Sequence, residues 1–191
     1  EAFAQVPVLR KSELLIRQKV ARQTTPFGGF STIGPGPHMR RIFASPGTIY
    51  EPEGASPDYW RTARALHAAG FRAGDLIHNS FSYHLTPAGA FMEGGAHALG
   101  CTVFPGGTGQ TEQQVEAMVE LHPVGYVGTP SFLKILLEKA DGLGTPVTSL
   151  RRALFSGEAF TPSQREWFAA RGIAGYQCYG TADVGLIAYE T

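Results

Sequence analysis

From residue 75 onward, short apolar runs alternate with helical patterns. The runs cover residues 76–78, 102–104, 126–127, 153–155 and 176–178. Successive runs are separated by roughly 20 to 30 residues, enough for a helix and two loops between parallel strands. This alternation predicts an α/β fold with a mostly parallel sheet flanked by helices.

Helix-start signals stand between the runs. Thr86-Pro87, Thr129-Pro130 and Thr161-Pro162 each place a threonine cap before a proline, whose missing N–H costs nothing at the first helical position. Thr111 with Gln114, and Thr161 with Gln164, have the spacing of a reciprocal capping box. Gly100 and Gly172 are placed to end helices. Two apolar stripes at helical intervals follow the caps, and they consist of Val115, Met118, Val119 and His122, and of Phe132, Leu133, Leu136, Leu137 and Ala140.

The first 74 residues have a different pattern. We predict a helix over 12–21, a loop over 24–37, a strand over 39–44 and an irregular segment over 46–57. Ser56-Pro57 would then start a helix over 59–69, with Trp60, Ala63 and Leu66 on one side and Gly70 at its end. No linker is long or polar enough to divide the chain, so we expect one domain over 1–191.

Composition excludes several classes of function. Lys plus Arg and Asp plus Glu are both 16, so the net charge is zero, and nucleic-acid binding through phosphate neutralisation is not expected. No run of 18 apolar residues predicts a membrane span, and the first residues lack the pattern of a signal peptide, so a cytoplasmic location is expected. Cys101 and Cys178 lie far apart in apolar contexts, which predicts two buried, reduced thiols.

Ligands of open α/β sheets bind beyond the carboxyl ends of the strands, so the loops after the strands are the candidate site. These loops contain two carboxylates together with several glycines and aromatic residues. Glycines admit a flat ring or a phosphate close to the backbone, and carboxylates bind Mg²⁺ or a ligand hydroxyl. The composition suits a nucleotide-like ligand beside an apolar one, and plain structural turns remain the alternative. The loops are Asn79–His84, Pro105–Gln110, Ser156–Ala159 and Tyr179–Asp183.

The order of these loops resembles the phenylacetate-CoA ligase family of adenylate-forming enzymes. Pro105–Glu112 is similar to that family's P-x-S-G-G-Q-T-E segment, Phe155–Thr161 to f-G-A-E-P-W-T, and Tyr179–Asp183 to Y-G-x-[ST]-E. Each match alone is weak, but their common order along the chain is specific. Further matching segments are Phe3–Lys11, Ala21–Phe30, Arg41–Ser45, Ala69–Asp75, Thr129–Ser131 and Ser149–Arg151.

The resemblance implies an AMP-forming acyl- or aryl-CoA ligase. Such an enzyme converts a carboxylic acid and ATP into an acyl-adenylate with Mg²⁺, and coenzyme A then displaces AMP to give a thioester. It further implies that the chain is part of the large N-terminal AMP-binding domain, with the small C-terminal domain beyond Thr191, so that this fragment alone is expected to be inactive. A homodimer is compatible with the resemblance.

The resemblance also assigns residues to roles. Asp183 stands where the family has its Mg²⁺-binding glutamate, and Asp183 and Thr48 are the implied catalytic residues. Tyr179 would stack on the adenine. The implied nucleotide-binding residues are Ser45, Gly47, Thr48, Ser156, Gly157, Glu158, Ala159, Cys178, Tyr179, Gly180 and Thr181. The implied acyl pocket, which would take an apolar or aromatic acid, consists of Phe81, Tyr83, Ser156, Gly157 and Cys178.

The sequence departs from the family at the phosphate loop. The family reads Ser-Ser-Gly-Thr-Thr-Gly-Lys-Pro, and here the aligned stretch is residues 45–52, Ser-Pro-Gly-Thr-Ile-Tyr-Glu-Pro. Pro46 removes a backbone donor, and Glu51 replaces the lysine. Two like charges about 6 Å apart repel by roughly 2–4 kcal/mol, enough to weaken triphosphate binding strongly. Ala182 also lacks the hydroxyl of the family's last motif, and Asp183 is one methylene shorter than glutamate.

Two other functions remain open at this point. One is a catalytically silent relative that binds a nucleotide, an acyl-adenylate or CoA, which the altered loop favours. The other is an unrelated α/β binding domain in which Tyr179 is a core aromatic and Glu158 is a carboxylate at a helix start. Coordinates that place Glu158, Tyr179 and Asp183 on different faces would favour the second.

Overall fold

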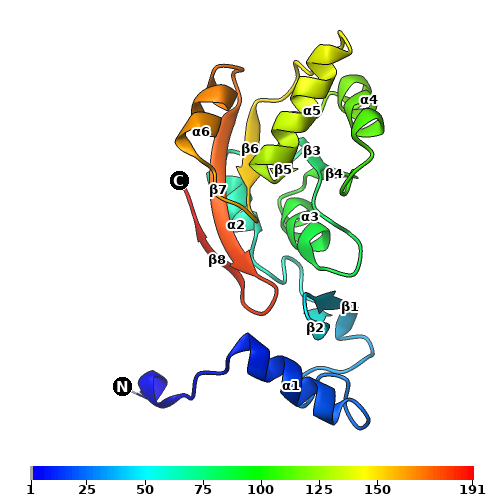
Figure 1. Ribbon diagram of the computed structural model, residues 1–191, viewed down its shortest axis with the longest axis vertical. Coiled ribbons are helices and arrows are strands. Elements are labelled where there is room, and N and C mark those ends of the chain that lie inside the picture. The colour runs from blue at the N-terminus through cyan, green and yellow to red at the C-terminus, as the bar shows by residue number, and fades with distance from the viewer. Residues whose placement is uncertain (1) are drawn as a thin grey trace. The chain divides into compact units, whose positions relative to one another are not determined.

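Beyond residue 75 the chain forms a six-stranded sheet with the order β4-β3-β5-β6-β7-β8 (Figure 1). The prediction of a mostly parallel sheet flanked by helices is confirmed. The final strand, β8, is antiparallel to β7 and was not predicted, because a short edge strand is defined by its pairing partner rather than by its own pattern. The parallel strands are β3 (Leu76–Asn79), β4 (Thr102–Pro105), β5 (Gly125–Gly128), β6 (Arg152–Phe155) and β7 (Ala174–Thr181), and β8 is Gly185–Tyr189.

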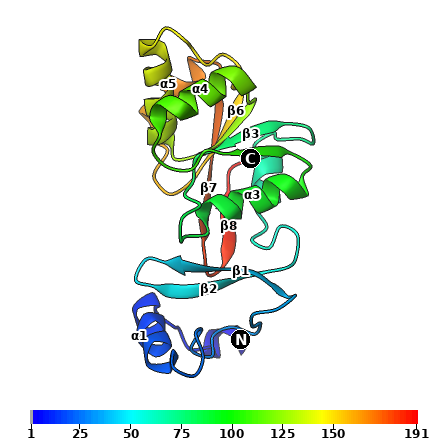
Figure 2. The ribbon, with the colours of Figure 1, turned by 90° about the vertical axis from the view of Figure 1, so that its right-hand side faces the viewer.

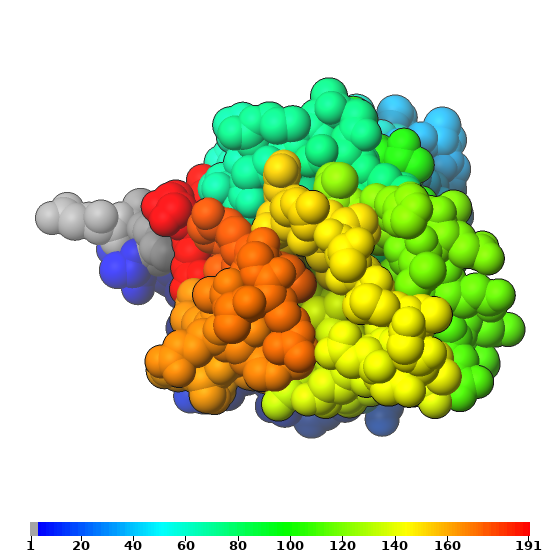
Figure 3. Space-filling view, turned by 90° about the horizontal axis from the view of Figure 1, so that it is seen from above, coloured from blue at the N-terminus to red at the C-terminus, as the bar shows by residue number. Residues whose placement is uncertain are grey.

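This computed structural model describes residues 2–191, with side chains from residue 4 onward. The sheet belongs to the second of two compact units, Ser56–Thr191, and the first unit is Glu1–Ala55. The assignment of residues 1–191 to one large domain stays a prediction. Strands β7 and β8 form a long hairpin (Figure 2). Figure 3 looks onto the amino ends of the parallel strands, where the segments that precede β3, β6 and β7 (teal, yellow and orange) lie together.

Proline caps begin two of the helices as predicted. The Thr129 hydroxyl accepts the N–H of Phe132, and Thr161 forms a capping box with Gln164. Thr86 is not a cap, because Pro87 takes the N-cap position without a side-chain bond. Likewise, Thr111 is already inside its helix, which has Gln110 as N-cap. These helices are α3 (Ala88–Ala98), α4 (Thr111–Leu121), α5 (Pro130–Gly142) and α6 (Pro162–Ala169).

Helix α2 (Ala63–Ala68) is shorter than predicted at its amino end. Asp58 and Arg61 have φ values of 48° and 65°, which an α-helix cannot contain, so Ser56-Pro57 does not start it. Instead the Asp58 carboxylate accepts the N–H of Ala63 at 3.2 Å. Trp60 lies outside the helix but is buried all the same, with its ring 5.6 Å from that of Phe91.

The main core lies between the sheet and helices α4, α5 and α6. The predicted stripe of α5 is buried there, with Phe132 at its margin, and Val115 and Met118 of α4 face it. Tyr126, Phe155 and Phe168 are the largest buried rings of this cluster. His122 does not continue the α4 stripe, because it is the C-cap in a left-handed conformation and its side chain is exposed. The stripes therefore predicted the buried faces except at this helix end.

Helices α2 and α3 pack against each other, and α3 also packs against β3 and β4. The Thr62 hydroxyl donates to the carbonyl of Phe91 at 2.7 Å. A Cβ at Gly95 would lie only 2.2 Å from that hydroxyl oxygen, so the two helices can approach this closely only with glycine there. Ile77 and Leu154 are buried but do not belong to the α5 cluster, and the alternation of strand side chains places them on the other face of the sheet.

The first unit contains a 3-10 helix (Ala2–Gln5), helix α1 (Lys11–Ala21) and an antiparallel pair, β1 (Met39–Ser45) and β2 (Ile49–Gly54). The predictions for α1, β1 and the loop between them are confirmed. The prediction of an irregular segment over 46–57 is wrong, because residues 49–54 pair with β1. Gln18 of α1 exchanges two hydrogen bonds with the backbone of Tyr50, at 2.9 and 3.0 Å, and so ties the helix to β2.

Both cysteines, Cys101 and Cys178, are buried and unpaired, as predicted. Among the helices that the structure describes, none is long and apolar enough to cross a membrane.

Candidate functional site

An apolar cavity of about 370 Å³ opens at the carboxyl ends of β3, β5 and β6. Residues of the loops that follow these strands contribute to it, as the rule for open α/β sheets predicts. Helices α3 and α5 and the glycine-rich loop after β4 complete the walls. The lining residues are Ser80, Phe81, Ser82, Ala88, Thr108, Gly109, Thr129, Phe132 and Gly157.

Two of the predicted acyl-pocket residues, Phe81 and Gly157, line this cavity. Tyr83 does not: its hydroxyl accepts a bond from Asn79 at 2.8 Å, and its ring packs against Gly89 of α3. Ser156 and Cys178 are not among the residues that line it. Sequence reasoning missed Phe132, because its place in an apolar helical stripe indicated only core packing.

The loop after β3 is held by a buried amide. Asn79 Nδ2 donates to the carbonyl of Gly89 at 2.9 Å, and Asn79 Oδ1 accepts the N–H of Phe81 at 3.0 Å. All of these bonds are inside the fold, where an unmade bond would cost about 1–3 kcal/mol. Asn79 therefore fixes the direction in which Phe81 enters the cavity.

The loop Ser156–Ala159 lies against β7. Ser156 N–H donates to the carbonyl of Gly128. Gln177 Nε2 donates to the carbonyl of Glu158 at 3.0 Å. Burial raises the pKa of the Cys178 thiol to about 11, so this cysteine is a neutral packing group rather than a nucleophile. The loop therefore contacts β7 directly, through Gln177.

The Glu158 carboxylate caps a helix that is distant in sequence. Its Oε1 accepts the N–H of Ser131, in the first turn of α5, at 2.7 Å. A negative charge at this end of a helix is favoured by the exposed N–H groups there. Glu158 is thus a carboxylate at a helix start, which agrees with the structural alternative given for it in the sequence analysis. Its side chain is also exposed, so a ligand can reach it.

Tyr179 is 61% exposed on β7, so it is not a core aromatic. Two residues further along, the hydroxyl of Thr181 accepts the N–H of Val184 at 3.2 Å and shapes the turn between β7 and β8. Trp60 Nε1 donates to the carbonyl of Ala182 at 3.2 Å and fixes this turn from outside. Asp183 is exposed at the tip of the turn. Tyr179 and Asp183 therefore belong to one hairpin, next to the loop that carries Glu158.

The predicted phosphate-loop residues lie in the first unit. Ser45 ends β1, and Gly47 and Thr48 form the turn to β2 with φ values of 94° and 60°. The Ser45 hydroxyl donates to Glu51 Oε1, and Lys11 Nζ lies 3.3 Å from the same oxygen. Glu51 is buried. The Ser45 hydroxyl and Lys11 are therefore already engaged by a carboxylate of the unit itself, and a second cation, Arg22, donates through Nη2 to the carbonyl of Thr48 in the turn.

The glycine-rich loop 105–110 rests on a buried polar pair that the sequence did not indicate. Gln114 Nε2 donates to the carbonyls of Gly107 and Gly109 at 2.9 and 2.6 Å, and its Oε1 lies 2.7 Å from His78 Nε2. Because the amide nitrogen faces two carbonyls, the amide oxygen faces the imidazole, and His78 Nε2 carries the proton. Burial lowers the pKa of His78 below 6.5, against the smaller opposing effect of this hydrogen bond.

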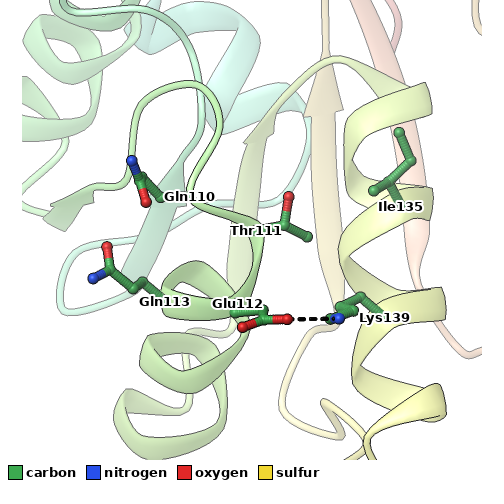
Figure 4. Close-up of a pocket in the computed structure, with 6 residues that line it drawn as sticks. All are labelled: Gln110, Thr111, Glu112, Gln113, Ile135 and Lys139. Carbon is green, nitrogen blue, oxygen red and sulfur yellow. Dashed lines mark ion pairs between the residues drawn. The ribbon is translucent and has the colours of Figure 1, made fainter.

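A second pocket of about 590 Å³ lies between the start of α4 and the middle of α5 (Figure 4). Glu112 of α4 reaches across it to Lys139 of α5 at 2.8 Å. Lys139 lowers the pKa of the Glu112 carboxyl through this contact. The other residues shown are Gln110, Thr111, Gln113 and Ile135. No predicted site residue lies here, and the walls are exposed and half-buried side chains of a groove between two helices.

Comparison with known proteins confirms the resemblance seen in the sequence. A curated phenylacetate-coenzyme A ligase of Aromatoleum evansii is 34% identical over 192 residues, covering 95% of this chain and 42% of that protein. Proteins of the same name from Pseudomonas putida and Escherichia coli are 32% and 33% identical over 96% and 95% of this chain. The chain thus spans less than half the length of these relatives. No family model matches the chain.

The fold is that of adenylate-forming ligases of known structure. The chain is similar to a 2-hydroxyisobutyryl-CoA ligase in complex with 2-HIB-AMP and CoA, with a TM-score of 0.80 and 25% identity over 94% of this chain and 40% of that one. A more distant likeness, with a TM-score of 0.57 and 17% identity, is to the amide bond synthetase McbA of Marinactinospora thermotolerans.

The buried His78 makes stability depend on pH. The folded chain keeps this imidazole neutral, whereas the unfolded chain binds a proton below about pH 6.5. The free energy of unfolding is therefore expected to fall as the pH drops from 6.5 towards the lower pKa of the folded state, by about 1.4 kcal/mol for each pH unit between the two values. Urea unfolding at several pH values between 5 and 7.5 measures this pH dependence of the free energy of unfolding.

The variant His78→Gln removes the titrating group, so its unfolding free energy is expected to change less over this range. His97→Gln, at an exposed position of α3, is the matched control and keeps the slope of the original chain. Equal slopes in the original chain and in His78→Gln would contradict the assignment of the effect to His78.

Proposed function

We propose that the chain forms the adenylate- and acid-binding part of an AMP-forming acyl- or aryl-CoA ligase that activates an apolar carboxylic acid. The observation that carries this proposal is the apolar cavity at the carboxyl ends of β3, β5 and β6, which shares Gly157 with the loop assigned to the adenine. Similarity to phenylacetate-coenzyme A ligases along 95% of the chain supports it. The activity is proposed for the full-length protein, because the chain spans 42% of that relative.

The proposed reaction has two steps. In the first, a carboxylate oxygen of the acid attacks the α-phosphorus of ATP, a P–O bond forms, and pyrophosphate leaves with its bonding electron pair. In the second, the thiolate of coenzyme A attacks the acyl carbon, and AMP leaves. The first step requires that the carboxylate be aligned with the α-phosphate and that water be kept away.

The residues of this chain would align the two substrates. The apolar part of the acid would lie between Phe81 and Phe132, with its carboxylate towards Ser156 and Gly157. Gly157 has a φ of 86°, and a Cβ there would have only ordinary contacts, so the backbone is open to a ligand. The exposed ring of Tyr179 would stack on the adenine, and residues 156–159 and 178–181 would border the nucleotide.

Asp183 fits the Mg²⁺ ion that such a reaction uses. Mg²⁺ is commonly bound by one or two carboxylates together with phosphate oxygens of the substrate, rather than by a cage of protein ligands. Asp183 offers one exposed carboxylate on a turn that Trp60 and Thr181 hold, and no cluster of three or more possible ligand residues occurs among the described residues. When bound, the ion would neutralise phosphate charge.

Three further parts of the proposal concern the whole protein. Coenzyme A would be the second substrate, and no residue of this chain is assigned to it. A homodimer is compatible with the resemblance, and a cytoplasmic location is expected. Light scattering and cell fractionation of the full-length protein measure these two properties.

Exchange of labelled pyrophosphate into ATP tests the first step. With the full-length protein, we expect exchange that depends on an added acid and is faster with aryl or apolar acids than with acetate, because the cavity is apolar. No exchange with any acid would remove the ligase function. Heat-inactivated protein is the control for contaminating exchange.

The variant Asp183→Asn tests the metal role. It is expected to reduce Mg²⁺-dependent exchange by tenfold or more while changing AMP affinity by less than about threefold, since AMP brings fewer phosphate charges for the ion to neutralise. Asp141→Asn, on the exposed side of α5, is the matched control and should leave both unchanged. Equal losses of exchange and of AMP binding would show instead that Asp183 has a structural role.

The first unit favours a second candidate, a catalytically silent relative that binds AMP or an acyl-adenylate. Its β1–β2 turn contains Pro46, which has no N–H to offer, and the buried carboxylate of Glu51 holds the Ser45 hydroxyl and Lys11. A turn that lacks one backbone donor and whose hydroxyl is already engaged offers fewer contacts to the additional phosphates of a triphosphate.

Calorimetry with AMP and with MgATP separates the two candidates. The ligase is expected to bind both, and the silent relative is expected to bind AMP at least a hundredfold more tightly than MgATP. Tight MgATP binding would therefore exclude the silent relative, and AMP binding without measurable MgATP binding would favour it.

A further inference from the structure

One wall of the apolar cavity is a loop whose backbone conformation is not fixed by the conformational preferences of its own residues. Thr108 and Gly109 of loop 105–110 line the cavity. Gly107, Gly109 and Gln110 have φ values of 67°, 76° and 48°, in the left-handed region. Outside contacts must therefore select this conformation among the many that glycines allow. One such contact is the N–H of Gly107, which donates to the carbonyl of Asn79 at 3.0 Å.

The side chain of Gln114 supplies two further polar contacts of the loop. It lies in the first turn of α4, is 2% exposed, and donates both amide hydrogens to loop carbonyls, those of Gly107 and Gly109. These two residues bracket Thr108, so the amide fixes the part of the loop that faces the cavity. The neighbouring Gln113 points outward and is exposed.

His78 fixes Gln114 in turn. The Nε2–H of His78 donates to Gln114 Oε1, so the amide oxygen and both amide hydrogens of Gln114 take part in hydrogen bonds. The imidazole ring is itself held between the rings of Phe104 and Tyr126, at 5.2 and 6.2 Å. A Cβ at Gly106 would lie 2.8 Å from both the imidazole nitrogen and the amide oxygen, so the loop packs directly onto the pair.

We propose that His78 and Gln114 are positioning residues that set the wall of the acid pocket, and thereby the affinity for the acid, without touching acid or nucleotide. The inference rests on the proposed function, because it takes the cavity as the acid site. A rigid wall keeps the width between Thr108 and Phe81 constant, whereas a loosened wall lets the loop move away from a bound acid. Loss of the pair should therefore weaken acid binding and leave the AMP site, on the β6 and β7 side, unchanged.

Gln114→Leu removes all three hydrogen bonds at nearly constant volume, and Gln113→Leu is the matched control on the exposed side of the same turn. His78→Gln is the conservative variant, because its amide can still donate to Gln114. Calorimetry with phenylacetate and with AMP measures binding, and hydrogen exchange of residues 105–110 reports the loop without any ligand.

In Gln114→Leu, loop exchange is expected to accelerate and phenylacetate affinity to fall, each by roughly tenfold or more, since one or two net hydrogen bonds are worth about that factor. AMP affinity should stay within about twofold, as it should for both ligands in Gln113→Leu. His78→Gln should change exchange and phenylacetate affinity in the same direction but less. If Gln114→Leu does not fold, His78→Gln tests the inference alone: faster loop exchange and weaker phenylacetate binding would support it, and unchanged values would contradict it.

The inference would be overturned if Gln114→Leu and Gln113→Leu had the same rate of loop hydrogen exchange and the same affinity for phenylacetate. Equal losses of phenylacetate and AMP affinity would also overturn it, because they would indicate a general structural role. A different result would contradict the proposed function itself. In that case the original protein would bind none of a series of apolar acids, although its loop would exchange slowly and Gln114→Leu would accelerate that exchange.

Discussion

The parallel pairing of β3, β5, β6 and β7 is the constraint on which the candidate site depends. Parallel strands end at one edge of a sheet, so segments that are dozens of residues apart in sequence meet there. Gly128 pairs with Phe155, and Phe155 pairs with Gln177, which brings the loops after β5 and β6 next to β7. The apolar cavity and the loop assigned to the adenine share Gly157 for this reason.

Buried amides turn this edge into a site of fixed shape. Asn79 holds the loop that carries Phe81, and Gln114 holds the loop that carries Thr108. An amide side chain suits this function because it donates and accepts at once, and a buried amide that lost its partners would be costly. The cavity can therefore remain apolar inside while its walls are fixed by polar contacts behind them.

Charge distinguishes the first unit from this arrangement. Glu51 and Glu53 are both buried, and each is paired with cations of the same unit, Lys11 for Glu51 and Arg41 for Glu53. Buried carboxylates are stable only with such partners. Because these pairs stabilise the β1–β2 hairpin, Glu51, Ser45 and Lys11 already have partners within the unit. The affinity for a triphosphate is therefore the most informative property to measure on this protein.

The sequence by itself determined the parallel strands and the helices beyond residue 75, but not β8, which is defined by its pairing with β7. The strand runs and the α4 and α5 stripes follow the period of their element, and Thr129 and Thr161 act on neighbours within the same turn. It also placed Phe81 and Gly157 at the site, since the end of a strand is a local feature. Only the tertiary structure decided that residues 49–54 form a strand, that Asp58 and Arg61 delay α2, and that Gln114 turns inward to His78 instead of capping its helix. Each of these depends on a partner that is remote in sequence or on a backbone conformation that such a partner stabilises, and no local pattern of residues contains that information.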